Sequence, residues 1–349
     1  MIRPKLSKSC HMLAKIKDIL GKSNNLLVLT HASPDHDAIC SILLFKSFLQ
    51  NHYSHINVDL VTNEVKWPQY ESWGLLGLNT IKNLIDQQTV NLNLYDYVFF
   101  LDTNRVQGNF IENTNEFKKK AIIIDHHTSK PEIDYLIEIN EHRASTTEQV
   151  YFIFKKLLGN DLVLTKEEAY LAQVGLIADT NRFLFCEQIT SDSYKLMEEM
   201  SKINKLNIEG IYNKMIKNTK NSVYVFKHLL QNTVFEENMA YTFVSPKFIE
   251  KNEYTKEDIK CACTHFLQSF VRTLEGVDWG FLVKPSASEK NVWRVSLRAN
   301  NGTIKVVDIA KQLNGGGHDY AAAGSTKAKY PWEAVENVLS IVESASLVS

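Results

Sequence analysis

Histidine and aspartate side chains gather in four short segments of the chain. Three of these segments directly follow short apolar runs, and the fourth ends a stretch with helical spacing. The four segments cover residues 31–37, 102–105, 125–127 and 179–183. A mixed set of carboxylates and imidazoles suits Mn²⁺, Mg²⁺ or Zn²⁺ better than an iron–sulfur cluster or a cysteine-rich zinc site. The sequence therefore predicts a divalent metal centre.

Each segment taken alone has a simpler explanation. Asp102 or Asp179 could be a helix cap or a turn residue, and His31 could be a histidine satisfied within the core. The run at 125–127 could lie on the surface. The combination favours the metal centre, because all four segments stand at expected strand or helix ends and no ligating pair of cysteines occurs.

Alternating strands and helices must position these segments. Short apolar runs predict buried strands at 26–30, 58–61, 97–101 and 121–124. Helical spacing predicts helices at 38–50, 146–158 and 166–178. Ser145 and Glu148 have the spacing of a capping box at the start of the second helix. This alternation predicts an N-terminal α/β domain with an open, mostly parallel sheet and flanking helices, in which loops at the carboxyl ends of the strands converge.

The rest of the chain predicts a smaller α+β domain. We expect a catalytic domain at 1–200, a connecting helix at 201–221 and a second domain at 222–349. Strands are expected at 239–244, 279–283 and 292–297, with a hairpin turn at 286–291. Helices are expected near 259–274, at 306–313 and after Pro331. The chain therefore combines a larger and a smaller domain.

Composition excludes several classes of protein. The 349 residues include 39 basic and 40 acidic side chains, so no global positive field favours a nucleic-acid coat protein or a membrane-surface binder. The five cysteines form no CxxC pair, which favours a reducing compartment. Apolar runs of about 18 residues, which a membrane span requires, are absent from the sequence. We therefore expect a cytoplasmic protein without a membrane partner.

The ordered motifs resemble those of the DHH phosphoesterase family. They are H-x-x-P-D-x-D-A at 31–38, D-T-N-R at 102–105, D-H-H at 125–127, A-D-T-x-x-F at 178–183, L-R at 297–298 and G-G-G-H at 315–318. The last two resemble the C-terminal DHH-associated domain of the first type. Within the family, the set is most similar to bacterial oligoribonucleases that also dephosphorylate 3'-phosphoadenosine 5'-phosphate (pAp).

The resemblance implies a centre of two Mn²⁺ ions, for which Mg²⁺ or Co²⁺ could substitute. The implied ligands are His31 and Asp35 for one ion, Asp37, His126 and Asp179 for the other, and Asp102 between them. Two ions can activate a nucleophile and hold the phosphoryl oxygens during an in-line displacement.

The resemblance also implies further catalytic and substrate-binding residues. Asp125 would orient an imidazole, His127 would contact a phosphate oxygen, and Arg105 would add a positive contact to the phosphate. In the second domain, the implied substrate-binding residues are Arg298, Gly315, Gly316, Gly317 and His318. Glycines let backbone N–H groups approach an anion, although a helix C-cap and turn would also explain the run.

The implied activity is Mn²⁺-dependent hydrolysis of very short oligoribonucleotides to mononucleotides, with pAp 3'-phosphatase as a second activity. A linear or cyclic dinucleotide phosphodiesterase, of the type that acts on pApA or c-di-AMP, is the main alternative. The G-G-G-H motif argues against a family II pyrophosphatase, and the short chain after residue 221 leaves little room for the extra modules of a RecJ-like exonuclease. A nucleotide-binding protein without activity should have lost some of the metal-binding residues, yet every expected Asp and His is present. The oligomeric state stays open, with a homodimer among the options.

Overall fold

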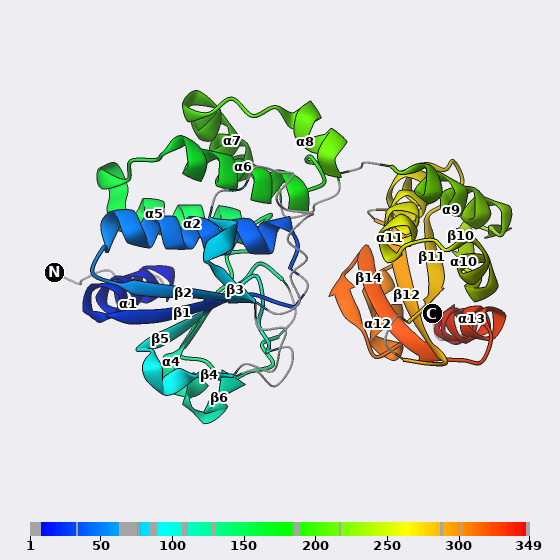
Figure 1. The fold of residues 1–349 in the computed structure, drawn as a ribbon, viewed down its shortest axis with the longest axis horizontal. Helices are drawn as coiled ribbons and strands as arrows, with labels where there is room; N and C mark the ends of the chain where they lie inside the picture. The colour runs from blue at the N-terminus through cyan, green and yellow to red at the C-terminus, as the bar shows by residue number, and fades with distance from the viewer. Residues whose placement is uncertain are drawn as a thin grey trace. The chain divides into compact units, whose positions relative to one another are not determined.

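The computed structural model describes residues 8–32, 34–62, 75, 77–83, 89–106, 111–127, 130–184, 189–215, 218–286, 289–300 and 302–346. The chain divides into two compact units, Met1–Ile211 (unit 1) and Tyr212–Ser349 (unit 2) (Figure 1). Each unit has a six-stranded sheet of its own.

Unit 1 is built around a sheet in which every neighbouring pair of strands is parallel. The strand order is β3-β2-β1-β5-β7-β8. The strands are β1 Asn25–Leu29, β2 Asn57–Thr62, β3 Ile81–Asn83, β5 Tyr97–Leu101, β7 Ala121–Ile124 and β8 Ile137–Ile139. Because β1 lies between β2 and β5, the strand order reverses there, and ligands of open α/β sheets bind at such a reversal. The predicted α/β class and parallel sheet are confirmed.

Helices and a small second sheet cover the two faces of this sheet. On one face pack α2 His36–His52 and α5 Thr146–Leu158, and α6 Lys166–Asp179 packs against these two helices. Here the centre of the Phe45 ring of α2 lies 4.8 Å from the ring centre of Phe99 of β5 and 5.5 Å from that of Phe154 of α5. On the other face, Phe117 of α4 (Phe117–Lys120) packs edge-on against Phe100, beside β4 (Val90–Asn91) and β6 (Ile111–Glu112). These aromatic contacts fix the helices against the strands that carry the site.

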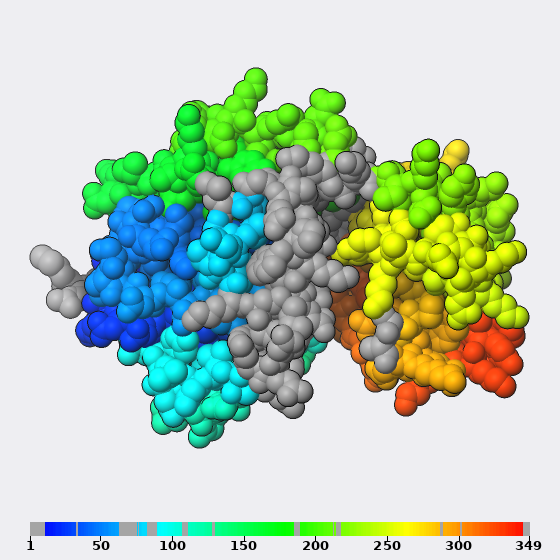
Figure 2. All heavy atoms as spheres, viewed as in Figure 1, coloured from blue at the N-terminus to red at the C-terminus, as the bar shows by residue number. Residues whose placement is uncertain are grey.

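The remaining helices of unit 1 precede β1 or follow α6, and the last of them crosses the boundary with unit 2. Helix α1 Lys8–Lys22 contacts α5, and α7 Ser191–Ile203 contacts α6, with α8 Ile208–Met215 after it. Short 3₁₀ turns occur at Leu78–Thr80, Leu92–Leu94, Thr114–Glu116 and Gly159–Asp161. Green atoms of the segment from α5 to α8 cover the upper side of unit 1 (Figure 2).

Unit 2 is a mixed sheet with helices on both faces. Its strand order is β13-β14-β12-β11-β10-β9, with β10 and β11 parallel and the other pairs antiparallel. The strands are β9 Val234–Glu236, β10 Met239–Phe243, β11 Trp279–Pro285, β12 Val292–Ala299, β13 Gly316–His318 and β14 Ala321–Lys327. The helices are α9 Lys220–Gln231, α10 Pro246–Asn252, α11 Lys256–His265, α12 Val306–Gln312 and α13 Pro331–Ser346. A π-helical turn at Phe266–Phe270 and a 3₁₀ turn at Val271–Thr273 continue α11.

Two separate cores hold unit 2 together. Alternate residues of the central strands face α12 and α13, among them Phe281, Val295 and Leu297. Ala240 and Leu282 face the opposite side, where α9, α11 and the turns after it pack. This alternation along β11 and β12 is the normal pattern of a sheet covered on both faces.

Several predicted elements differ from the structure. The stretch 201–221, where the sequence predicts one connecting helix, holds the end of α7, the separate helix α8 and the start of α9, while residues 216–217 lie outside the described part. The predicted hairpin joins β11 and β12, although residues 287–288 of its turn are also outside that part. Within the described ranges, none of the helices is long and apolar enough to cross a membrane.

Candidate metal centre

The structure brings the predicted histidines and aspartates of unit 1 together. His31, Asp102 and the segment 125–127 follow β1, β5 and β7, which are neighbours in the sheet. Asp37 lies in the first turn of α2, and Asp179 is the last residue of α6. Parallel strands and two helix ends therefore deliver these side chains to one edge of the sheet.

Interatomic distances show how close the donors lie. His31 Nε2 is 3.6 Å from Asp102 Oδ2, and His126 Nε2 is 3.5 Å from Asp102 Oδ1. His126 Nε2 is also 3.2 Å from Asp179 Oδ2. Two ligands of one ion, each bound at about 2.0 to 2.2 Å, stand about 3 to 3.5 Å apart in tetrahedral or octahedral geometry. The donor separations are close to those within a coordination sphere.

Among the described residues of unit 1, three groups of three donors have ligand atoms within 4.8 Å of one another. Two of them, called the donor sets, are His31, Asp35 and Asp102, and Asp37, His126 and Asp179. The third is Asp102, Asp125 and His127, which shares Asp102 with the first set. The two donor sets contain the six ligands that the family resemblance implies for two ions. The residues present therefore fit a pair of divalent cations with oxygen and imidazole ligands.

Electrostatics of the cluster favour a bound cation. Burial, together with the charges of Asp102 and Asp35, raises the pKa of Asp37 well above its usual value. Burial and the same neighbours, with Asp37 added, raise the pKa of Asp179. Carboxylates this close together resist simultaneous ionisation, and a divalent cation removes that repulsion. Burial also lowers the pKa of His126, which favours the neutral imidazole that a metal ligand requires.

Asp102 has an unusual backbone and a dense set of contacts. Its φ is 59°, in the left-handed region that Asp tolerates better than most residues, and its side chain is buried. Burial opposes ionisation, but contacts with His31, His127 and His126 lower the pKa of Asp102 below its usual value. Burial alone would lower the pKa of His31, but the hydrogen bond to Asp102 and the charges of Asp102 and Asp35 raise it to about 9. Asp102 is therefore a buried carboxylate held in its charged form.

Asp35 and Asp37 differ in their surroundings. Asp35 caps α2, because its Oδ1 accepts the Ala38 N–H at 3.0 Å, and it is exposed. Asp37 is buried, and its two oxygens accept the N–H groups of Thr146 at 2.7 Å and Thr147 at 3.0 Å. One carboxylate thus faces the solvent while the other is fixed by the start of α5.

Asp125 orients His127. Its Oδ1 lies 2.7 Å from His127 Nδ1, and its backbone oxygen accepts the Gln149 Nε2–H at 2.9 Å. Burial alone would lower the pKa of His127, but the hydrogen bond to Asp125 and the charges of Asp102 and Asp125 raise it to about 10. A protonated imidazole, about one third exposed, can donate to an anionic oxygen.

Arg105 lies in an exposed ion pair with Glu132, with Nη1 and Oε1 3.4 Å apart. Exposed pairs of this kind contribute about 0 to 1 kcal/mol, so the guanidinium can leave its partner at little cost. A contact between Arg105 and a phosphate stays a prediction.

The candidate residues of unit 2 occupy neighbouring strands. Arg298 of β12 and His318 of β13 both pair with Ala321 of β14, which places the two side chains on one face of the sheet. Arg272 lies beside them, and its Nη2–H donates to the Tyr320 carbonyl at 2.7 Å. Burial and the charge of Arg272 lower the pKa of Arg298 to about 10. Two guanidiniums and an imidazole therefore lie around the end of β13.

The glycine run is part of the sheet. A Cβ atom at Gly315 would lie 2.0 Å from the Ala323 carbonyl oxygen, and one at Gly317, where φ is +139°, would lie 2.5 Å from that of Ala321. Gly316 has open space around the corresponding position. Close approach to β14 therefore explains the need for glycine at 315 and 317. The helix cap that the sequence suggested is also present, because the Gly315 N–H donates to the Ala310 carbonyl at 2.8 Å after the end of α12. An anion contact of the run stays a prediction.

Sequence reasoning missed several residues that touch the centre. Thr146, Thr147, Gln149 and Gly175 contact the ligands or their neighbours, yet none belongs to a motif that signals metal binding. Spacing at Ser145 did locate the start of α5, and its hydroxyl accepts the Glu148 N–H. The expected capping box is wrong in its second half, because the Glu148 carboxylate accepts the N–H of Ala144 instead.

Two family models match the chain in the predicted order. Residues 25–176 match the DHH family, N-terminal domain, and residues 236–346 match the DHHA1 domain. The chain is 25% identical over 226 residues to the bifunctional oligoribonuclease and PAP phosphatase NrnA of Bacillus subtilis, covering 64% of this chain and 67% of that protein.

Two further comparisons bear on length and fold. A membrane protein–large ribosomal subunit bL9 fusion protein of onion yellows phytoplasma is 24% identical over 336 residues, and the chain spans 37% of its length and 91% of its own. The solved structure of an exopolyphosphatase-related protein from Bacteroides fragilis has a TM-score of 0.73 at 20% identity, covering 99% of this chain and 97% of that one. It shows the same fold.

Both matched models, in the order DHH then DHHA1, cover most of the chain, and the clustered donors of the first domain could hold metal ions. The chain therefore belongs to the DHH family of metal-dependent phosphoesterases, hydrolases of phosphoester bonds, and carries a DHHA1 domain at its C-terminal end.

Proposed function

We propose that the protein is a Mn²⁺-dependent phosphodiesterase that hydrolyses very short oligoribonucleotides to mononucleotides and also removes the 3'-phosphate of pAp. The observation that carries this proposal is that two sets of three donors lie side by side at the reversal of strand order. One set contains Asp102, and His126 of the other lies 3.5 Å from it. The oligoribonuclease and PAP phosphatase activities in the name of the Bacillus subtilis relative support the substrate class.

The proposed ligands are those of the two sets, with Asp102 between the ions. When bound, two divalent ions supply Lewis acidity that polarises the phosphoryl group and activates water. His31, Asp35 and Asp102 would hold one ion, and Asp37, His126 and Asp179 the other. Mg²⁺ and Co²⁺ accept the same oxygen and imidazole donors and are expected substitutes.

His127 is the proposed contact to the phosphate. Its Nδ1–H donates to Asp125, so the second ring proton of the imidazolium is on Nε2. That group can donate to a non-bridging oxygen, where negative charge grows as the phosphoester bond breaks. Asp125 keeps the ring both charged and oriented, which makes it a positioning residue of the same step.

The residues proposed to hold the remainder of the substrate are Arg298, Gly315, Gly316, Gly317 and His318. Their support is the shared face of Arg298 and His318 beside Arg272, since guanidinium and imidazole groups bind phosphate and stack on bases. A cytoplasmic location and a homodimer stay predictions from the sequence.

The test is a substrate panel with purified, Mn²⁺-loaded protein. The panel holds pAp, linear and cyclic dinucleotides, five-nucleotide RNA, long single-stranded DNA and pyrophosphate, each followed by product analysis. We expect mononucleotides from the linear dinucleotide and the five-mer, and AMP from pAp. An Asp102→Asn preparation controls for contaminating nucleases. Cleavage of cyclic dinucleotide alone would favour the alternative activity, and cleavage of pyrophosphate alone would contradict the proposal.

A further inference from the structure

The first turn of α5 contacts two of the proposed ligands. Thr146 Oγ1 donates a hydrogen bond to Asp102 Oδ1 at 3.0 Å, while its backbone N–H donates to Asp37 at 2.7 Å. Thr147 N–H donates to the other oxygen of Asp37 at 3.0 Å. Thr146 is fully buried. One residue therefore touches a carboxylate from each of the two donor sets.

We propose that Thr146 is a positioning residue of the metal centre, whose hydroxyl fixes the carboxylate plane of Asp102 so that both ions can bind. The inference rests on the proposed function, because it assumes that Asp102 is a ligand. Rotation about the terminal bond of an Asp side chain is broad and roughly two-fold, so this carboxylate needs a partner to hold one orientation. The hydroxyl supplies that partner and leaves Asp102 its charge.

Threonine suits this task better than a flexible residue would. Its β-branched side chain restricts χ1, so the direction of the hydroxyl follows from the backbone of α5. In this bond the threonine hydroxyl is the donor and Asp102 Oδ1 the acceptor, at 3.0 Å. The hydroxyl therefore holds one particular oxygen of the carboxylate.

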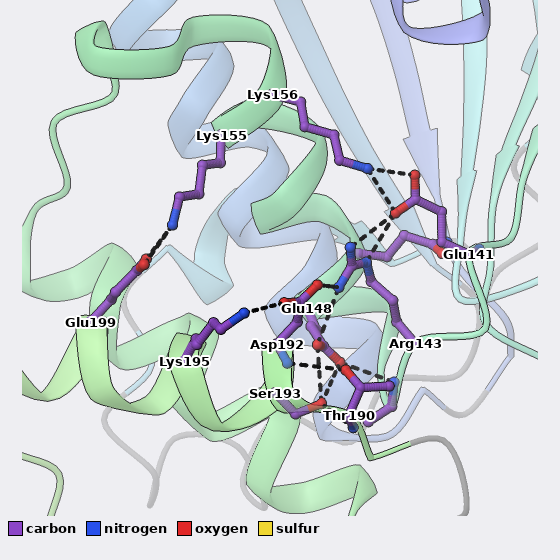
Figure 3. Close-up of polar contacts among 12 residues, drawn as sticks. Glu141, Arg143, Glu148, Lys155, Lys156, Thr190, Asp192, Ser193, Lys195 and Glu199 are labelled. Atoms are coloured by element: carbon purple, nitrogen blue, oxygen red, sulfur yellow. Dashed lines mark hydrogen bonds and ion pairs between the residues drawn. The ribbon is translucent and has the colours of Figure 1, made fainter. Parts of the chain in front are cut away.

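The turn that carries Thr146 is itself held in place. Glu148 Oε2 accepts the Ala144 N–H at 3.0 Å, and Glu148 Oε1 accepts the Ser193 hydroxyl of α7 at 3.1 Å. Arg143 lies 3.4 Å from the same carboxylate, and its guanidinium packs 4.0 Å over the Phe152 ring. Figure 3 shows Arg143, Glu148 and Ser193 of this network at the start of α5. The hydroxyl therefore projects from a fixed support.

Groups that orient metal ligands affect metal affinity more than a purely structural hydrogen bond does. Loss of such a partner reduces metal affinity by about 10- to 100-fold. A structural hydroxyl at a distant buried site should affect folding alone. Metal affinity measured on metal-free protein therefore separates the two roles without any assay of turnover.

The experiment compares Thr146→Val and Thr146→Ser with Thr242→Val. Thr242 is equally buried, and its hydroxyl donates to the Leu229 carbonyl at 2.8 Å in unit 2, which makes it a matched control. Mn²⁺ affinity is measured by titration calorimetry, and stability by thermal unfolding of the metal-free proteins. We expect about 10- to 100-fold weaker Mn²⁺ binding in Thr146→Val, a smaller loss in Thr146→Ser, which keeps the hydroxyl without the β-branch, and unchanged binding in Thr242→Val.

Each outcome decides the question. If Thr146→Val does not fold, Thr146→Ala, which adds no methyl group beside the carboxylate, is measured with the same expectation. Two results would overturn this inference and leave the proposed function standing. One is wild-type Mn²⁺ affinity in the variant without the hydroxyl, and the other is an equal loss of Mn²⁺ affinity in that variant and in Thr146→Ser. Failure of the wild-type protein to bind Mn²⁺ would overturn the proposed function and this inference with it.

Discussion

A single methyl group at Gly175 should disrupt the metal centre. Gly175 lies in α6, where a Cβ atom would stand 2.2 Å from Thr147 Oγ1, 2.7 Å from Thr147 Cβ and 3.0 Å from Asp37 Oδ1. Ordinary contacts of this kind are 3.4 to 4 Å. In Gly175→Ala the helix α6, the turn at Thr147 or both must therefore move by about 1 Å, whereas a functional site tolerates about 0.5 Å.

The change in unfolding free energy of Gly175→Ala should be smaller than its effect on the metal centre suggests. Overpacking a core by one methyl group costs about 1 to 3 kcal/mol, and replacing glycine by alanine inside a helix returns up to about 1 kcal/mol. The net loss should be about 0 to 3 kcal/mol, below the roughly 5 to 15 kcal/mol by which native proteins are stable, so the variant is expected to fold. Displacement of Asp37 should nevertheless reduce Mn²⁺ affinity by at least about tenfold, with a comparable loss of kcat/KM.

Two measurements test this expectation, with Gly21→Ala as the control. Gly21 also lies in a helix, α1, but the space around its missing Cβ is open. Thermal unfolding and Mn²⁺ titration calorimetry are run on both variants. The control should keep its Mn²⁺ affinity and lose no stability. Normal Mn²⁺ affinity and normal turnover in Gly175→Ala would refute the reasoning, because the clash could then relax without moving Asp37.

Three further predictions concern the ions and the substrate. Asp102→Asn should abolish turnover. In thermal-shift measurements, Mn²⁺ at 100 times its Kd should stabilise the wild-type protein by about 2.7 kcal/mol and leave this variant unchanged. Arg298→Ala and His318→Ala should keep normal Mn²⁺ stoichiometry. Each should raise KM by roughly one to two decades, the effect expected for loss of one charge-assisted hydrogen bond. An unchanged kcat/KM in both variants would show that these residues do not bind substrate. Catalytic efficiency should be highest for about two to five nucleotides and fall for a long strand of the same composition, since the sequence has no extended basic tract with stacking aromatics; rising efficiency with length would contradict this.

The strands of unit 1 were predictable because each is an apolar run between polar segments. The expected limits of β5, β7 and α5 agree with the structure at both ends, and those of β1 and β2 differ by one residue. The polar side chains come just after the last apolar residue of each strand. The sequence could therefore also place His31, Asp102 and the segment 125–127 at one edge of the sheet.

Other elements depend on tertiary contacts that no local pattern records. Strand β13 consists of Gly316–His318, and it pairs with β14 so closely that a Cβ at Gly317 would lie 2.5 Å from the Ala321 carbonyl oxygen. Helix α1 was not predicted, although Ile16, Ile19 and Leu20 are buried in it. Thr146 and Gly175 are ordinary helix residues in the sequence, and their importance follows from the distance between α5, α6 and the end of β5.

The metal-free centre stores unfavourable energy in several forms. Asp102 has a left-handed backbone. Asp37 is buried and Asp179 is partly buried, both beside other carboxylates, and the turn of α5 must direct two N–H groups and a hydroxyl at carboxylates. Such costs persist only where the surrounding structure fixes the geometry, as the parallel strands and the network around Glu148 do here. Divalent cations remove the repulsion between the carboxylates but not the backbone strain. Ion binding should therefore stabilise unit 1 most at the ends of β1, β5 and β7, because the groups that repel one another in the metal-free protein stand there.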